Sequence, residues 1–204
     1  MRKEKRIVSL FFLLLGMSLY VYRADAQSVG IKTNVLYGAT TTPNLGLEVV
    51  LGKKTTLDIA GGYNPWLLSN KEDNKKIKHW LVQPELRLWN CEAFNRSYWG
   101  FHALYGRYNM GNITFPLDLF QGMKNNRYEG DAVGAGVSYG YQWYLGNRWN
   151  LEATFGFGYA YFDYKRFDCI RCGEYQGKGH KHYLGPTKVG VSVIYLIKSK
   201  KYPL

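Results

Sequence analysis

The chain has 204 residues, 46% of them hydrophobic and 17% aromatic, with 23 Gly, 6 Pro and a formal net charge of +12. This composition excludes a disordered tail and a collagen-like fibre. The 18 Tyr, 10 Phe and 6 Trp beside so many glycines favour packed β-sheet over a helical bundle, and the mean hydropathy of -0.32 argues against a bundle of membrane helices.

The first 26 residues have the three zones of a secretory signal peptide. A basic start is followed by an apolar run from Ile7 to about Tyr22, and then by the small-x-small sequence Ala24-Asp25-Ala26. We therefore predict a signal peptide at residues 1–26 and one mature domain at residues 27–204. A retained membrane anchor is the alternative, although the apolar run is short for a helix that crosses a bilayer.

The rest of the chain alternates with period two between large apolar side chains and small or polar ones. From Val133 to Leu145, for example, the odd positions are mostly Val, Tyr, Trp and Leu, and the even positions are mostly Gly, Ser and Gln. Such alternation predicts β-strands with two different faces. The runs predict eight strands, at residues 29–37, 44–51, 55–63, 77–90, 97–110, 130–145, 149–164 and 182–198.

The apolar face of these strands needs a covering layer, and the mature sequence contains no amphipathic helix that could supply one. A sheet that closes on itself, with its aromatic face toward lipid, solves this problem. We therefore predict an all-β fold, an eight-stranded antiparallel transmembrane up-and-down barrel in the outer membrane of a Gram-negative bacterium. Short connections at 52–54, 91–96 and 146–148 and long ones at 64–76, 111–129 and 165–181 fit the two sides of such a barrel.

The same alternation places a set of charged and polar side chains inside the predicted barrel. The interior of eight strands is just wide enough for side chains to fill, so the four carboxylates and three fixed bases are expected to form ion pairs. The predicted charged interior consists of Lys32, Glu48, Asp58, Glu85, Arg87, His102, Glu152 and Lys188, with Asn34, Gln83 and Gln142 beside them.

Two other functions stay open for such a barrel. A narrow gated channel is one, although a pore normally needs more strands. A lipid-modifying enzyme is the other, with His102 as its candidate base and Ser138 or Ser192 as a hydroxyl group on another strand. A hydrogen-bonded interior histidine is the simpler interpretation of His102, so no catalytic residue is assigned.

The last long connection contains Cys169 and Cys172, followed by His180 and His182. In an exported protein the two cysteines are expected to form a disulfide. The four side chains are also of the types that hold zinc in a tetrahedral N2S2 site, and free thiols are the third possibility. Zinc is therefore the one candidate cofactor. Cys91 is expected at the opposite end of the barrel, without a partner.

The predicted long connections are rich in lysine and arginine. A basic rim beside the outer leaflet is well placed to pair with the phosphates of lipopolysaccharide. A nucleic-acid partner is not expected, because the basic residues are scattered and form no groove-reading motif.

The chain resembles a family of small outer-membrane proteins from Bacteroidales-type bacteria that is catalogued as a domain of unknown function. The resemblance lies in residues 32–46, 61–66, 78–85, 136–143 and 177–188. It implies an outer-membrane barrel with no assigned enzyme activity, whose genes often lie near those for fimbrillin-like surface proteins. We therefore expect a non-enzymatic barrel that supports the cell envelope or a surface appendage, such as a fimbria, through its extracellular loops.

Overall fold

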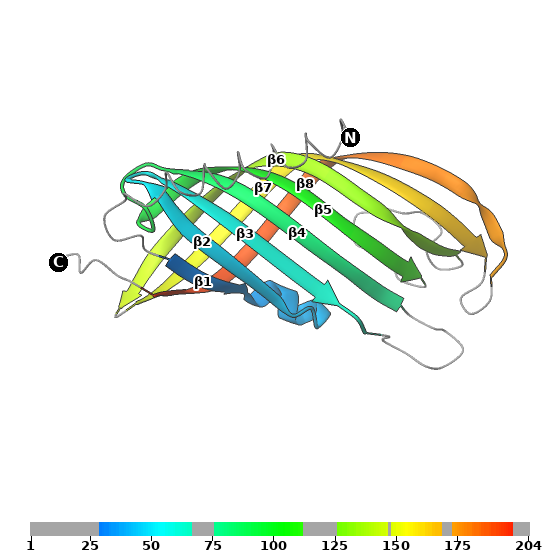
Figure 1. Ribbon diagram of the computed structural model, residues 1–204, viewed down its shortest axis with the longest axis horizontal. Helices are drawn as coiled ribbons and strands as arrows, with labels where there is room; N and C mark the ends of the chain where they lie inside the picture. Colours follow the sequence, from blue (N-terminus) through cyan, green and yellow to red (C-terminus); the bar gives the residue numbers. More distant parts are fainter. Residues whose placement is uncertain (1–28, 67–75, 112–125, 147, 169–172, 198–204) are drawn as a thin grey trace, which may run out of the picture.

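The computed structural model describes residues 29–66, 76–111, 126–146, 148–168 and 173–197. Eight antiparallel strands form a closed ring, in which each strand pairs with the next and β8 pairs back with β1. Figure 1 shows them inclined to the long axis of the molecule. The ring of eight antiparallel strands predicted from the alternation is confirmed, whereas the predicted signal peptide lies outside the described residues. The strands are β1 (Val29–Asn34), β2 (Asn44–Gly52), β3 (Thr55–Asn64), β4 (Lys76–Trp89), β5 (Arg96–Gly111), β6 (Asn126–Gly146), β7 (Trp149–Asp168) and β8 (Tyr175–Leu196).

The two faces of the ring have opposite chemistry. Large apolar side chains such as Phe101, Phe155 and Leu184 face outward and are more than half exposed. Charged side chains such as Arg87 and Glu48 face inward and have no exposed surface. This is the reverse of a water-soluble barrel, in which apolar residues fill the interior.

An apolar cluster closes the end of the barrel near the short connections. Trp89, Phe94, Tyr98, Ile194 and Leu196 are all buried there. Phe94 belongs to the connection between β4 and β5, and its carbonyl oxygen accepts a hydrogen bond from the Nδ2 atom of the buried Asn150. The connection therefore folds into the barrel end and covers it.

The first strand is shorter than predicted, because it ends at Asn34 and a 3-10 helix, η2 (Val35–Thr40), follows. The Asn34 side chain accepts a hydrogen bond from the backbone N–H of Leu36, which caps the helix. The Asn44 side chain bonds the backbone N–H and C=O groups of Asn34 and replaces the next step of the β1–β2 ladder. The described residues include no helix that is long and apolar enough to cross a membrane.

The last three strands are longer than predicted at the end of the barrel that carries the long connections. β6 begins at Asn126, β7 continues to Asp168, and β8 begins at Tyr175 instead of residue 182. Figure 1 shows β7 and β8 continuing beyond the ends of β3 and β4. His180 therefore lies in strand β8 and not in a loop, which corrects the predicted connection at 165–181, and His182, the first residue of the predicted strand, lies well inside β8.

Candidate functional site

The charged interior is organised around Arg87, on β4. Its Nη1 atom lies 2.7 Å from carboxylate oxygens of both Glu48 and Glu152, and its Nε atom lies 2.6 Å from Glu85. Its Nη2 atom lies 3.2 Å from Asp58. A guanidinium group has five N–H donors in a plane, so one arginine reaches carboxylates from β2, β3, β4 and β7 at once.

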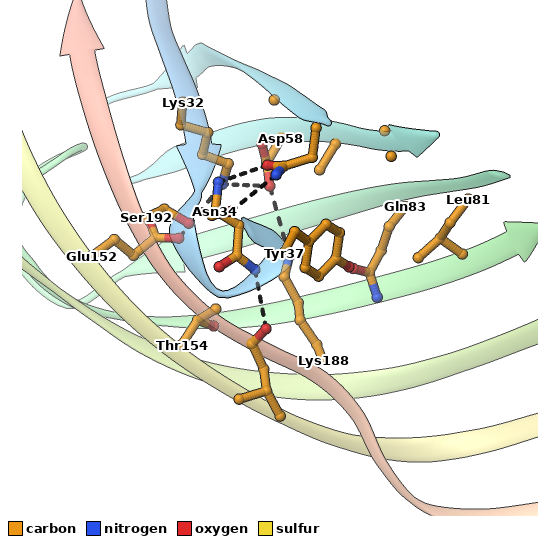
Figure 2. A pocket seen from close by; sticks show the side chains of 16 residues that line it. Lys32, Asn34, Tyr37, Asp58, Leu81, Gln83, Glu152, Thr154, Lys188 and Ser192 are labelled. Atoms are coloured by element: carbon orange, nitrogen blue, oxygen red, sulfur yellow. Dashed lines mark hydrogen bonds and ion pairs between the residues drawn. The ribbon is translucent and has the colours of Figure 1, made fainter. Parts of the chain in front are cut away.

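Two lysines bring further positive charge to the carboxylates around Arg87. The Nζ atom of Lys32 lies 2.6 Å from Asp58 and 3.5 Å from Glu152, and Figure 2 shows it extending toward both. The Nζ atom of Lys188 lies 2.9 Å from Glu85 and 3.7 Å from Asp58. The four buried carboxylates thus face three cations, and each carboxylate touches at least two of them.

Neutral side chains satisfy more of the carboxylate oxygens. Thr56 donates a hydrogen bond to Glu48 at 2.6 Å, Ser138 donates to Glu85 at 2.5 Å, and Gln142 donates to Glu152 at 2.7 Å. Buried charges are costly unless they are paired and hydrogen-bonded. Each of the four carboxylates meets both conditions, and the network takes residues from seven of the strands, β1 to β4 and β6 to β8.

A small polar cavity of about 40 Å³ lies against the cluster, between it and helix η2. In Figure 2 the ring of Tyr37 lies between Asn34 and Gln83, with Lys32, Asp58 and Lys188 nearby. The space is large enough for water. The cavity at this level of the barrel is therefore of a size for water and not for a substrate.

His102 lies at the edge of the charged cluster and has a hydroxyl partner. Its Nε2 atom is 2.8 Å from the Oγ1 atom of Thr187, and its Nδ1 atom is 3.9 Å from Glu85. Neither Ser138 nor Ser192 is hydrogen-bonded to His102, whose hydroxyl partner is Thr187. The Ser138 hydroxyl donates to Glu85 instead. The candidate base thus has a threonine, and not a serine, beside it.

The structure brings all eight predicted interior residues, from Lys32 to Lys188, into this one buried network, in which the predicted ion pairs form. Sequence reasoning missed Thr56 and Thr187 as members. Thr56 alternates with Asp58 on β3, and the alternation could have identified it. Thr187 is the unpaired residue of a β-bulge between Lys188 and Pro186, and alternation gave no signal for it.

The candidate metal and disulfide residues are only partly described. Cys169 and Cys172 lie outside the described residues, so the disulfide and the zinc site remain predictions. His180 and His182 face outward on β8, where their ring centroids are 5.6 Å apart and Tyr159 hydrogen-bonds His182. The described part of the chain holds no group of three or more metal-binding side chains. Cys91 is exposed and free.

Comparison with known proteins gives a family. No curated protein and no solved structure shows a significant match to the chain. One family model, described as a protein of unknown function (DUF3575), matches residues 9–197. Because this match covers most of the chain, including all eight strands, the protein belongs to the DUF3575 family.

Proposed function

We propose that the protein is an integral outer-membrane β-barrel without enzyme activity, which supports the cell envelope or a surface appendage through its outer end. One observation carries this proposal: a closed barrel with apolar side chains outside and an ion-paired network inside. An apolar outer face is suited to lipid as its solvent. A closed ring also lets neighbouring strands pair their backbone N–H and C=O groups, which lipid cannot hydrogen-bond.

The outward-facing side chains change character at one level of the barrel. Arg107, Asp131, Asp163 and His180 are paired in register across β5, β6, β7 and β8, and we call them the boundary row. Toward the short connections, aromatic residues follow directly, with Tyr105 and Tyr161 paired to Val133 between them. An aromatic girdle beside a charged row is typical of a membrane interface.

The apolar belt below the boundary row has the height of a bilayer core. On β6 it runs from Val133 to Trp143, which is roughly 33 Å at ~3.3 Å per residue. Strands tilted by about 40° would bring this to about 25 Å along the membrane normal, the usual height of the apolar band. Trp149 and Tyr195, in edge contact at 5.0 Å, lie at the other end of the belt.

The outer end offers a contact for lipopolysaccharide. Lys165 and Lys178 lie directly opposite each other on β7 and β8, just beyond the boundary row, and both are exposed. Like charges in directly opposed positions repel, so a phosphate group would stabilise the pair. A K165Q/K178Q variant is expected to bind lipopolysaccharide less well than a K53Q/K54Q control at the opposite end. Equal binding would contradict this contact.

The first experiment is fractionation of cells followed by gel migration with and without boiling. An outer-membrane location together with a heat-dependent shift is expected, because a closed barrel stays folded in cold detergent. A soluble periplasmic protein without a shift would overturn the proposal. A closed interior also predicts no steady conductance in planar bilayers, and reproducible single-channel steps would favour a narrow channel instead.

The supporting role is tested by deletion of the gene. Altered sensitivity to detergents and bile salts, or altered display of fimbriae, is expected if the barrel supports the envelope or an appendage. Restoration by the wild-type gene is the control. Unchanged behaviour in both assays would contradict this role.

One observation favours acyl transfer as a second candidate function. The His102 and Thr187 contact resembles a base beside a nucleophilic hydroxyl. Glu85, however, lies 3.9 Å from the other ring nitrogen and is already held by Ser138. A mass shift in lipid A between wild-type and T187V strains would support this candidate, and identical spectra would remove it.

A further inference from the structure

A second cavity, of about 260 Å³, lies inside the barrel beyond the charged cluster. In strand register, its lining residues are farther from the short connections than Arg87, His102 and Ser138. Its walls come from β4 to β8 and include Leu81, Leu104, Met110, Ala132, Phe162 and Tyr183. We propose that this cavity is a binding site for a small uncharged apolar molecule, the size of one or two aromatic rings.

The cavity exists because inward positions in this half of the barrel carry small side chains. Ala132 on β6 and Ala160 on β7 are 9% and 2% exposed, so both face the interior. In the other half, the corresponding space is filled by Arg87 and the carboxylates around it. The interior of an eight-stranded barrel can be filled or can hold one small ligand, and this barrel does both, at different levels.

The chemistry of the walls selects an apolar ligand. Phe162 makes edge contacts with Tyr108 and Tyr183, at centroid distances of 5.9 and 6.5 Å, and Leu104 and Met110 line the cavity from β5. Polar groups are few, as in most ligand pockets. They include His79, Arg107 and Thr187. The Thr187 hydroxyl is already bonded to His102, and the Arg107 guanidinium is paired with Asp131 and 61% exposed.

The charged cluster gives the ligand no counter-charge. The described ion pairs of Lys32, Arg87 and Lys188 all go to the four interior carboxylates, so an anion would compete with groups of the same sign. The size is also informative, since a dry apolar cavity of about 150 Å³ binds benzene. A cavity of about 260 Å³ accommodates a bicyclic aromatic molecule.

The site is independent of the membrane proposal, because the side chains that define its apolar walls, such as Leu104, Ala132 and Ala160, face the interior of the ring. A soluble barrel with the same interior would bind the same ligand. The two proposals can therefore fail separately.

Indole, which is uncharged and bicyclic, is a suitable probe. The full mature protein would be prepared in deuterated detergent with ¹³C-labelled Leu and Met methyl groups. We expect saturable intermolecular NOEs from indole to the methyl groups of Leu104 and Met110. Signals at the outward-facing Leu184 would report partition into detergent alone and should not saturate.

Two variants fill the cavity, and one matched variant does not. A132L places a larger side chain into it, and L104W does so from another strand, so both should reduce the NOEs to Met110 at least tenfold. A135L is the control, because Ala135 lies three residues along β6 and is exposed on the outer face. The methyl signal of Leu196, in the apolar cluster at the other end, shows that each variant is folded.

The absence of saturable NOEs in the wild-type protein would overturn the proposal. NOEs as strong as those of the wild-type protein in folded A132L and L104W would also overturn it. NOEs from residues 112–125 to these methyl groups without indole would also overturn it, because the chain itself would then fill the cavity. Loss in both filling variants with retention in A135L would support it.

Discussion

Arg87 is the residue on which the interior depends most. It contacts all four buried carboxylates and lies over the ring of Tyr98, with 4.3 Å from its Cζ atom to the ring centroid. Removing one partner from a buried ionic network leaves uncompensated charge and costs about 3–5 kcal/mol. We expect R87M to lower the free energy of unfolding by that amount, measured by urea titration of the protein folded into lipid vesicles.

The matched control is R107M, since Arg107 pairs with Asp131 at 2.8 Å but its side chain is 61% exposed. Exposed pairs contribute about 0–1 kcal/mol, so this variant should unfold close to wild type. R87K should be intermediate, because a lysine keeps the charge but loses the planar set of donors. If R87M and R107M had the same effect, the interior network would not be a major source of stability.

Gly140 shows how tightly the barrel is packed beside Arg87. A Cβ atom at Gly140 would collide with the ring and hydroxyl of Tyr98, which is fully buried. Overpacking of this kind costs about 1–3 kcal/mol, and we expect that loss in G140A. G52A is the control, because a Cβ atom there meets nothing within 4 Å. Equal urea midpoints for the two variants would show that Tyr98 can move freely.

At the residue scale, alternation alone was enough to identify the interior charges. Each of them lies in a stretch of regular register, where period two fixes which side chains face inward, and Lys188 begins such a stretch directly after the bulge in β8. Thr187 escaped because the bulge at this point of β8 adds a residue that interrupts the alternation. Where the backbone departs from the regular ladder, the alternation in the sequence no longer predicts which side of the sheet a side chain faces.

At the scale of elements, Asn34 joins three pieces of structure. Its Oδ1 atom accepts hydrogen bonds from the N–H groups of Leu36 in η2 and Val191 in β8, and its Nδ2 atom donates to the carbonyl of Val189. Loss of a cap costs about 1 kcal/mol. In N34A we expect faster hydrogen exchange at the amides of Leu36 and Val191, with little change in β5 and β6.

The neighbouring T33A variant is the control for this prediction. The Thr33 hydroxyl makes only long, exposed contacts, at 3.3 and 3.4 Å, with Asn44, so its removal should leave the exchange of both amides unchanged. Unchanged exchange at Leu36 in N34A would mean that η2 does not depend on its cap.

The number of strands was predictable, but two sets of their ends were not. The predicted β1 ran on over Val35, Leu36 and Tyr37 because these residues are apolar, and the capping by Asn34 is a local competition that periodicity does not register. The outer parts of β7 and β8 were predicted as a loop because they lack apolar residues in alternation. Beyond the boundary row, both faces of these strands carry polar residues and glycine, such as Lys165, Lys178 and Gly179, so the apolar alternation disappears while the ladder continues.

At the scale of the whole molecule, the proposed lipid surface can be tested at two depths on one strand. Val137 lies on the outer face of β6 within the apolar belt and is 43% exposed, whereas Asp131 lies in the boundary row of the same face. An arginine near the bilayer midplane costs about 2–4 kcal/mol, and one near the interface about 0–1. We therefore expect V137R to destabilise the protein folded in vesicles by several times more than D131R, measured by reversible urea titration.

This comparison separates lipid from water as the solvent of the outer surface. Both positions are partly exposed, so arginine can enter either without displacing a packed side chain, and in water the two substitutions should have similarly small effects. A depth-dependent cost arises only if Val137 faces hydrocarbon and Asp131 does not. Equal small effects would place the belt in water, and the exposed aromatic and aliphatic side chains of all eight strands would then need a protein partner to cover them.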